Sequence, residues 1–374
     1  MKILIKISAV LVFIILILFL IAEGVYRYRE SKMLQSEKFF FKQQFQTHKN
    51  TVFTKSYGNL LLVLDPYLVY KNKPNYSHGK MHINGHGFRG GEINLKKPKD
   101  TIRVIITGGS AAFNTGIDDD NNTFESILER KLNEIAKTSG KKAEVINAAV
   151  IAYTSYQEMI YVILTLCDYQ PDLVINFTGW NDYMNSRIVP SHNSYQQMIH
   201  SEFEAFLDRL PWESLLSYSA FYRNLRLRQK VYFANLNDEQ IRGIAGEFCI
   251  NMIKENLVLK AKGIKHIVIL QPELSFKKNL SRNEKETMTL GMYRDHETIS
   301  KYYQLAMDCM KNQKTGANIV AYDFSGIFSD TKEEIFSMPH DTVHINETGT
   351  KIIADEIFKR IIDLHLFDLS PVSE

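Results

Sequence analysis

Five short apolar runs recur along this chain and are separated by longer stretches with helical periodicity. The runs occupy residues 103–107, 144–147, 172–177, 266–270 and 318–323. Short runs of this kind, rich in β-branched residues, are typical of buried strands. Strands that alternate with helices imply right-handed crossover connections. The sequence therefore predicts a five-stranded parallel sheet with helices on both faces.

The intervening patterns are helical. They occupy residues 122–137, 154–167, 239–262, 297–312 and 347–366. Asn346 stands just before the last pattern and is expected to cap that helix, since its side chain can accept hydrogen bonds from the first amides. The regular spacing is interrupted at 183–236 and 273–295, which we interpret as insertions after the third and fourth strands.

The first insertion contains a basic segment, FYRNLRLRQKVYF, at residues 221–233. A solvated helix face is the simplest interpretation of this segment. Contact with anionic lipid or an acidic glycan, and a lid over a substrate, remain open. The net charge of the whole chain is only +3, which gives no argument for a nucleic-acid partner.

The amino-terminal stretch 3–22 is apolar apart from Lys6 and Ser8 and is about long enough to span a bilayer. Ala22 and Glu23 make a poor cleavage site for a signal peptide, so we expect an uncleaved transmembrane anchor within residues 1–25. Basic residues after the stretch would, read literally, keep the rest of the chain in the cytoplasm. A short tail before a large domain is nevertheless the usual layout of an exporting signal anchor, which we favour.

The remainder divides into a stalk and N-terminal extension at 26–100 and a larger domain at 101–368. The three cysteines, Cys167, Cys249 and Cys309, are far apart and lack CxxC spacing. We therefore expect small buried side chains at these positions and predict neither a disulfide framework nor a zinc ribbon.

Ser110 follows the first predicted strand, in RVIITGGSAAFNTG at residues 103–116. A serine in a turn at the carboxyl end of a parallel strand lies where open α/β sheets place their chemistry. Ser110 is therefore a candidate nucleophile that needs a base, an orienting carboxylate and donors to an oxyanion. The same loop is neither GxGxxG nor a Walker loop, so no nucleotide cofactor is predicted.

The segment MPHDTVHINETG, at residues 338–349, supplies the missing base and carboxylate. Asp341 and His344 are three apart on one turn, so the carboxylate can accept the imidazole Nδ1 hydrogen while Nε2 faces a serine. His340 could join them as a metal ligand, but no further cluster of His or Cys with ligand spacing accompanies the three, and no metal is predicted.

Two other loops hold further candidates. Asn181, in TGWND at residues 178–182, could direct its amide inward as an oxyanion donor or simply cap a turn. His86 and Arg89, in INGHGFRGGEI at residues 83–93, could reach the site, although a packing or turn role is the favoured interpretation of both.

Four blocks occur in an order that resembles the SGNH (GDSL-type) hydrolase family. They are GGS at Ser110, NAAVIAYTS at 147–155, GWND at Asn181, and DTVH before the last helix. The resemblance covers roughly residues 103–365, and the segments before it are similar to the extension of membrane-anchored bacterial members. It implies a flavodoxin-like three-layer α/β/α fold and the reactions of esterases, lipases and carbohydrate O-deacetylases, without a cofactor.

Carried over onto this sequence, the resemblance implies that Ser110 is the nucleophile, His344 the base and Asp341 its supporting carboxylate. It also implies oxyanion donors at the Ser110 amide, the Ala152 amide and Asn181. The family's usual Asp before the serine is Gly109 here. Its expected glycine in the second block is Ala152, where alanine would be strained at positive φ and adds a methyl group to the pocket.

We therefore expect a single-pass protein of the bacterial inner membrane whose extracytoplasmic domain is a serine esterase. The first substrate hypothesis is an acetyl ester of a cell-surface carbohydrate, and lipid esters remain open. One alternative is an O-acyltransferase that uses the same triad to acylate a polysaccharide. Another is a non-catalytic binding module anchored to the membrane.

Overall fold

The computed structural model describes residues 2–34, 61–188, 219, 235–289, 296–312, 319–336 and 341–367. The chain divides into two compact units. The first comprises residues 1–56 and 196–232, and the second comprises residues 57–195 and 233–374. The basic segment at 221–233, most of the predicted stalk and His340 lie outside the described residues.

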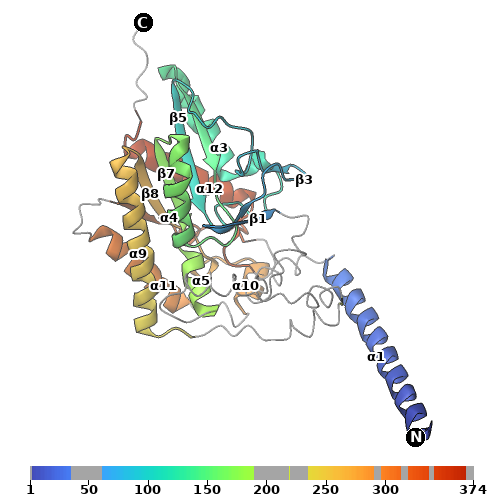
Figure 1. The fold of residues 1–374 in the computed structure, drawn as a ribbon. Coiled ribbons are helices and arrows are strands. Elements are labelled where there is room, and N and C mark those ends of the chain that lie inside the picture. The colour runs from blue at the N-terminus through green and yellow to red at the C-terminus, as the bar shows by residue number, and fades with distance from the viewer. Residues whose placement is uncertain are drawn as a thin grey trace. The chain divides into compact units, whose positions relative to one another are not determined.

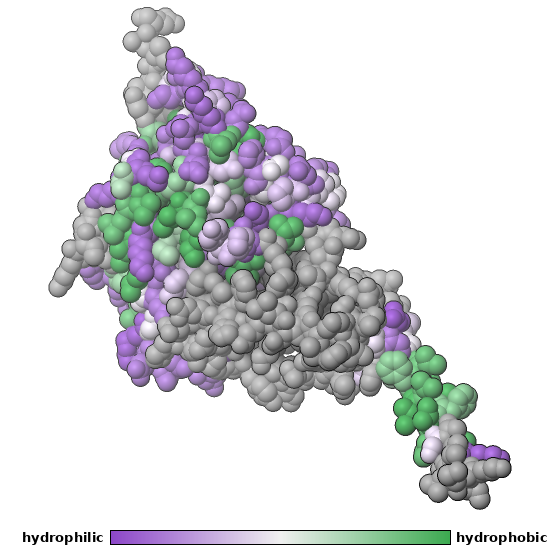
Figure 2. Space-filling view, in the orientation of Figure 1, coloured by the Kyte–Doolittle hydropathy of each residue, from purple (hydrophilic) through white to green (hydrophobic). Residues whose placement is uncertain are grey.

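Helix α1 (Lys2–Leu34) is the described part of the first unit, apart from Ser219. Its segment Val10–Tyr28 has a mean hydropathy of 2.4, none of it is buried, and it is long and apolar enough to cross a membrane. Figure 2 shows this helix as a largely apolar rod. A helix that is apolar on all sides is typical of a segment covered by lipid, because exposing its side chains to water is unfavourable. The helix runs further than the predicted anchor at 1–25.

The second unit is built on a five-stranded parallel sheet with the order β6-β5-β7-β8-β9 (Figure 1). The strands are β5 (Thr101–Gly108), β6 (Lys142–Asn147), β7 (Leu173–Thr178), β8 (Lys265–Leu270) and β9 (Val320–Asp323). This is the flavodoxin-like order 2-1-3-4-5. The five predicted strands are confirmed. Every residue of β7 is buried, as expected for a strand covered on both faces.

Helices cover both faces of the sheet (Figure 1). On one face α3 (Phe124–Ala136) packs against α12 (Glu347–Asp363). On the other face α9 (Asp238–Ala261) packs between α4 (Ser155–Leu164) and α11 (His296–Lys311). The predicted three-layer α/β/α arrangement is confirmed, and Asn346 caps α12 by accepting from the amides of Thr348 and Gly349.

Shorter elements fill the connections. They are α5 (Trp180–Ile188), α10 (Arg282–Met288), and the 3-10 helices η2 (Asp120–Asn122), η3 (Lys137–Ser139), η4 (Leu166–Tyr169) and η5 (Leu274–Phe276). Helix α5 includes the start of the first predicted insertion, whereas η5 and α10 occupy the second. The rest of the first insertion is described only at Ser219 and at residues 235–236.

Residues 61–98 precede the sheet, and we call them the N-terminal extension. It begins with two antiparallel hairpins, β1 (Leu62–Asp65) with β2 (Val69–Asn72), and β3 (Ser77–His78) with β4 (Met81–His82). The remainder is irregular, as its glycines predict. The Asn72 side chain donates to the Ala149 carbonyl at 2.9 Å, so the extension is joined to the loop after β6.

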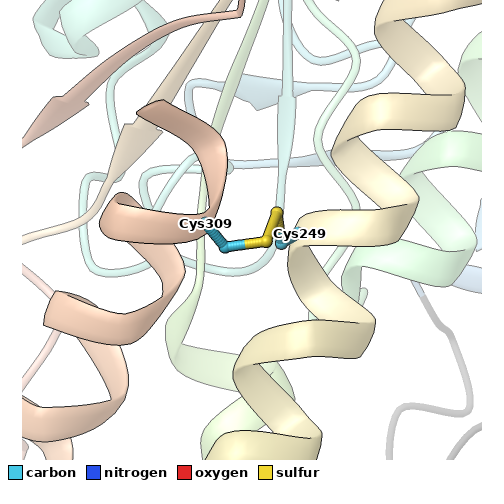
Figure 3. The surroundings of a disulfide bond; sticks show 2 residues. All are labelled: Cys249 and Cys309. Carbon is cyan, nitrogen blue, oxygen red and sulfur yellow. A yellow bond between two sulfur atoms is a disulfide. The ribbon is translucent and has the colours of Figure 1, made fainter. Parts of the chain in front are cut away.

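Cys249 and Cys309 form a disulfide between α9 and α11 (Figure 3). The prediction that these two are ordinary buried side chains was wrong. They are 60 residues apart in sequence, and only the packing of α9 beside α11 brings them together. Cys167 is buried and free, as predicted.

Candidate active site

Three of the predicted site residues follow the carboxyl ends of the neighbouring strands β5, β6 and β7. Ser110 lies two residues beyond β5, Ala152 lies in the loop after β6, and Asn181 is the second residue of α5, which follows β7. Parallel strands have their carboxyl ends at one edge of the sheet, and β5 lies where the strand order reverses. Open α/β sheets bind ligands at such a point.

Two glycines shape the turn that carries Ser110. Gly108 has a φ of +149°, and a Cβ there would lie 2.2 Å from the Phe177 carbonyl oxygen. A Cβ on Gly109 would lie 2.2 Å from Nδ2 of Asn181. The space that a side chain at position 109 would need is therefore occupied by the Asn181 side-chain amide. Ser110 itself is buried, with 4% of its surface exposed.

The loops after β6 and β7 meet above Gly109. Nδ2 of Asn181 donates to the Tyr153 carbonyl at 2.8 Å, which fixes the direction of the amide. The same nitrogen carries a second hydrogen. The neighbouring Ala152 has a φ of +63°, so the strain expected for alanine at this position is present.

Asp341 and His344 are in direct contact in the segment before α12. Asp341 is fully buried, and its Oδ1 accepts from the amides of Val343 at 2.8 Å and His344 at 3.1 Å. Its Oδ2 contacts Nδ1 of His344. A carboxylate on Nδ1 keeps the hydrogen on that nitrogen and leaves Nε2 as the basic atom. The catalytic roles of these residues stay predictions.

Hydrogen bonds tie this segment to the same sheet edge. The amide of Leu274, which follows β8, donates to the Thr342 carbonyl at 2.8 Å. Asn122 follows the Ser110 turn, and its side chain donates to Glu347 at the start of α12 at 2.8 Å. The Thr350 hydroxyl donates to the Asn122 carbonyl at 2.9 Å. Residues far apart in sequence are thus joined around one edge.

Asp182, next to Asn181, was not singled out in the sequence. It accepts from the Ser155 amide at 3.0 Å and from the Ser155 hydroxyl at 2.5 Å, and so ties the start of α4 to α5. Burial raises the pKa of Asp182 to about 6, against the lowering effect of these hydrogen bonds. Its signal in the sequence was an acidic residue in the first turn after a strand-end glycine.

Glu273, which follows β8, is another buried carboxyl that sequence reasoning missed. It accepts from the Ser275 amide at 2.8 Å, and Leu274 beside it bonds the Thr342 carbonyl between Asp341 and His344. Burial raises the pKa of Glu273 to about 7. Its position three residues after a predicted strand was the available signal.

The structure separates the two candidates of the N-terminal extension. Nδ1 of His86 lies 3.0 Å from the Tyr169 hydroxyl, a packing contact beside η4. Arg89 instead contacts the chain that follows Ser110. Within the described part of the chain, no group of three or more His, Cys, Asp or Glu is placed to hold a metal ion.

No protein-family model matches the sequence, and no curated protein is significantly similar to it. Solved structures do resemble the fold. An acetyl xylan esterase, AlAXEase, is 14% identical with a TM-score of 0.41, covering 70% of this chain and 100% of its own. A catalytic mutant of Axe2, an acetylxylan esterase from Geobacillus stearothermophilus, is 13% identical with a TM-score of 0.43, covering 73% and 97%.

A putative acylhydrolase from Bacteroides fragilis is 14% identical with a TM-score of 0.37, and the match covers 73% of this chain and 91% of that one. The three matched structures are thus esterases and an acylhydrolase by their descriptions. Because these identities are 14% or lower and these TM-scores are below 0.5, we base the functional proposal on the site itself.

Proposed function

We propose that this chain is a membrane-anchored serine esterase of the SGNH hydrolase type. The observation that carries the proposal is the buried contact between Asp341 and Nδ1 of His344, in a segment joined to the sheet edge where Ser110 follows β5. A nucleophile, an oriented base and a fixed carboxylate are the three parts that serine hydrolysis requires.

The reaction follows from these roles. Ser110 Oγ attacks the ester carbonyl carbon, and His344 Nε2 accepts the hydroxyl proton while Asp341 stabilises the imidazolium. The tetrahedral intermediate collapses, and His344 gives its proton to the departing alcohol. Water then attacks the acyl-enzyme, His344 takes one water proton, and that proton returns to Ser110 Oγ as the acid is released.

Three donors would hold the negative oxygen of the tetrahedral intermediate. The amides of Ser110 and Ala152 supply two, and the second hydrogen on Asn181 Nδ2 supplies the third. The Tyr153 carbonyl pre-orients that amide before substrate binds. Donors fixed in advance stabilise developing charge without a cost of reorientation at the moment of reaction.

The proposed substrate is an acetyl ester on a cell-surface carbohydrate. An apolar helix at the amino terminus would keep the enzyme beside such a polymer. The small side chains of Ala111 and Ala112 next to Ser110 are compatible with a short acyl group. Lipid esters at the same membrane are the alternative substrate class.

The disulfide supports an extracytoplasmic position for the catalytic domain. Disulfides persist in oxidising compartments such as the bacterial periplasm and are rare in the cytosol. The bond between Cys249 and Cys309 joins α9 and α11 inside the same unit as the candidate site. We therefore propose that α1 spans the inner membrane and that the second unit lies outside the cytoplasm.

The test is hydrolysis of p-nitrophenyl acetate and longer esters by the full chain in detergent. Ser110→Ala and His344→Ala should each lower kcat by roughly a thousandfold or more, the scale expected for a broken triad. The double variant Ser77→Ala/His78→Ala, an exposed serine and histidine in β3, is the matched control and should keep full activity.

A serine-directed phosphonate probe separates the remaining outcomes. Labelling that is lost in Ser110→Ala, with little hydrolysis but rapid acyl transfer to an added glycan, would make the enzyme an acyltransferase. Equal rates in wild type and Ser110→Ala, together with no labelling of either, would contradict the catalytic proposal and favour a binding module.

A further inference from the structure

We propose that Arg89 is a positioning residue that fixes the turn carrying Ser110. The N-terminal extension would then be part of the catalytic apparatus and more than a connection to the membrane helix. This inference rests on the proposed esterase function, since a fixed nucleophile matters only where Ser110 reacts.

The Arg89 guanidinium is held by four acceptors that all follow Ser110 in the chain. Nη1 donates to the carbonyls of Phe113 at 2.8 Å and Asn114 at 3.0 Å, and Nη2 donates to the carbonyl of Ile117. Nε donates to Oδ1 of Asp120 at 2.8 Å. Only 1% of the Arg89 side chain is exposed, so water cannot replace these bonds.

Two of the carbonyls bound by Arg89, those of Phe113 and Asn114, belong to the same turn as the nucleophile, and the third, of Ile117, follows directly after it. The amide of Phe113 donates to the Gly109 carbonyl at 2.9 Å, and the amide of Thr115 donates to the Ser110 carbonyl at 3.0 Å. The peptide unit between Asn114 and Thr115 therefore bonds Arg89 through its carbonyl and the backbone of Ser110 through its amide. A shift in the guanidinium would be passed directly to the position of Ser110.

Arg89 is itself anchored to the central sheet. Its amide donates to the carbonyl of Asn147, the last residue of β6, at 3.0 Å. The Asn147 side chain donates to the Ala112 carbonyl at 3.1 Å, which is a second bond to the Ser110 turn. The guanidinium thus acts from a point fixed by the sheet, and the turn is held against β6 by two residues.

A lysine could not reproduce this arrangement. The guanidinium is planar and presents its donors in a rigid fork, whereas an ammonium is a point charge on a flexible stem. The acceptors span residues 113–120, and a lysine at position 89 could satisfy only some of them. Carbonyls left without donors in a buried turn would reorganise to find new partners.

Arg103 provides a matched control, because it lies near the start of β5, the strand whose other end leads into the Ser110 turn. It is also fully buried, and it donates to the carbonyls of Leu95 at 3.0 Å and Asn94 at 2.9 Å and to Glu144 at 2.6 Å. It too joins the N-terminal extension to the core. The extended chain from Arg103 to Gly108, about 17 Å long, and Gly109 separate it from Ser110. Its loss should therefore destabilise the fold without moving the Ser110 turn.

The experiment compares Arg89→Ala, Arg89→Lys and Arg103→Ala in the full detergent-solubilised chain, well below every melting temperature. The rate of amide hydrogen exchange at residues 110–118 measures how often the turn opens, and hydrolysis of p-nitrophenyl acetate measures kcat and KM. We expect Arg89→Ala to speed exchange of these amides about tenfold or more. It should also lower kcat by about a hundredfold with little change in KM, because a misplacement of about 1 Å has this effect.

Further readouts separate positioning from general destabilisation. Millimolar guanidinium chloride should partly restore kcat in Arg89→Ala by filling the vacated site, and should not raise kcat in Arg103→Ala. Arg103→Ala should keep wild-type exchange at 110–118 and wild-type kcat despite its lower melting temperature. Where Arg89→Ala does not fold, Arg89→Lys carries the same comparison.

Unchanged exchange at 110–118 in the Arg89 variants would overturn the inference, as would an equal loss of kcat in Arg103→Ala. A wild-type chain that hydrolyses no ester and takes no phosphonate label would instead defeat the proposed function. In that case the exchange rates still decide whether Arg89 fixes the turn.

Discussion

Ala152 has a left-handed backbone conformation, with a φ of +63°, in the loop proposed to form part of the oxyanion hole. A left-handed conformation costs a non-glycine residue roughly 1–2 kcal/mol. Glycine relieves this strain, but it also makes the unfolded chain more flexible, which cancels part of the gain in stability. We expect Ala152→Gly to raise the free energy of unfolding by up to about 1 kcal/mol in chemical denaturation. Hydrolysis of p-nitrophenyl acetate should be maintained or faster.

Ala149 is the control for this substitution, because it is buried in the same loop and has no positive φ. Ala149→Gly should lower stability by about 1 kcal/mol or more, since glycine there adds flexibility to the unfolded chain and removes a buried methyl group. Equal destabilisation by both glycines would show that the conformation of Ala152 is not strained.

Asp341 is predicted to act through the orientation and tautomer of His344. Asp341→Asn places an amide beside Nδ1 of His344, which favours the tautomer with its hydrogen on Nε2. We expect kcat to fall by about 10³ to 10⁴ while the fold is retained. Burst-phase kinetics with a p-nitrophenyl ester, beside the exposed Asp330→Asn as control, measure this loss. A change below tenfold would rule out the proposed role of Asp341.

Local spacing in the sequence predicted the contact between Asp341 and His344, because side chains three positions apart on one turn lie close together. No such spacing existed for Arg89. Three of its four acceptors are backbone carbonyls, which every residue carries and which leave no mark in the sequence. The strain at Ala152 was predictable from its place in the second block, whereas the amide of Asn181 above Gly109 depends on two loops meeting in space.

Two glutamates are buried where β7 contacts α4 and α9. Glu158 accepts from the Thr178 hydroxyl at 2.5 Å and from the Asn176 side-chain nitrogen Nδ2 at 3.0 Å, and Glu255 accepts from the same nitrogen at 3.3 Å. Burial raises the pKa of Glu158 to about 8 and the pKa of Glu255 well above its ordinary value. The carboxyl of Glu158 is therefore protonated in the folded chain near neutral pH, and burial favours the neutral form of Glu255 in the same direction.

The sign of the resulting pH dependence follows from proton counting. An unfolded glutamate releases its proton near 4.5, so between 4.5 and 8 the folded chain binds more protons than the unfolded chain. The free energy of unfolding then falls as pH rises, by about 1.4 kcal/mol per pH unit for each such proton. His266, whose pKa burial lowers to about 3, opposes this trend only below 6.5.

We therefore predict that the melting temperature of the second unit falls between pH 6.5 and 8. Glu125, whose pKa burial raises to about 8, acts in the same direction. Glu158→Gln keeps a neutral side chain at every pH and should reduce the slope by the contribution of one proton, whereas the exposed Glu239→Gln should leave the slope unchanged. Calorimetry across this range measures the slope, and a melting temperature that rises with pH would contradict the burial of protonated carboxyls.

The sequence predicted the elements well because each depends on a local pattern. The strands are short apolar runs, and α12 begins directly after Asn346, whose side chain caps the helix through a contact within one turn. The contacts between elements were not predictable in this way. Cys249 and Cys309 meet because α9 and α11 pack together, and 60 residues of intervening chain separate them in sequence.

At the scale of the whole chain, an apolar helix that could cross a membrane and a disulfide occur in separate units of one polypeptide. Both features have one explanation if α1 delivers the second unit to an oxidising compartment. A disulfide that closes a loop of this length would stabilise the fold by about 4 kcal/mol through the unfolded chain. A second unit left in the cytosol would lack that contribution.

This explanation predicts the number of thiols that react in cells. The chain has three cysteines, and two of them form the disulfide, so an exported chain should offer only Cys167 to a polyethylene-glycol maleimide after denaturation. Bacterial cells expressing the full chain should show one added mass on a gel. A version that begins at Tyr26 and stays in the cytosol should show three. Cys249→Ser should give two added masses in both versions, because Cys309 is then free to react.

Three reactive thiols in the full chain would place the second unit in the cytoplasm and reverse the proposed orientation.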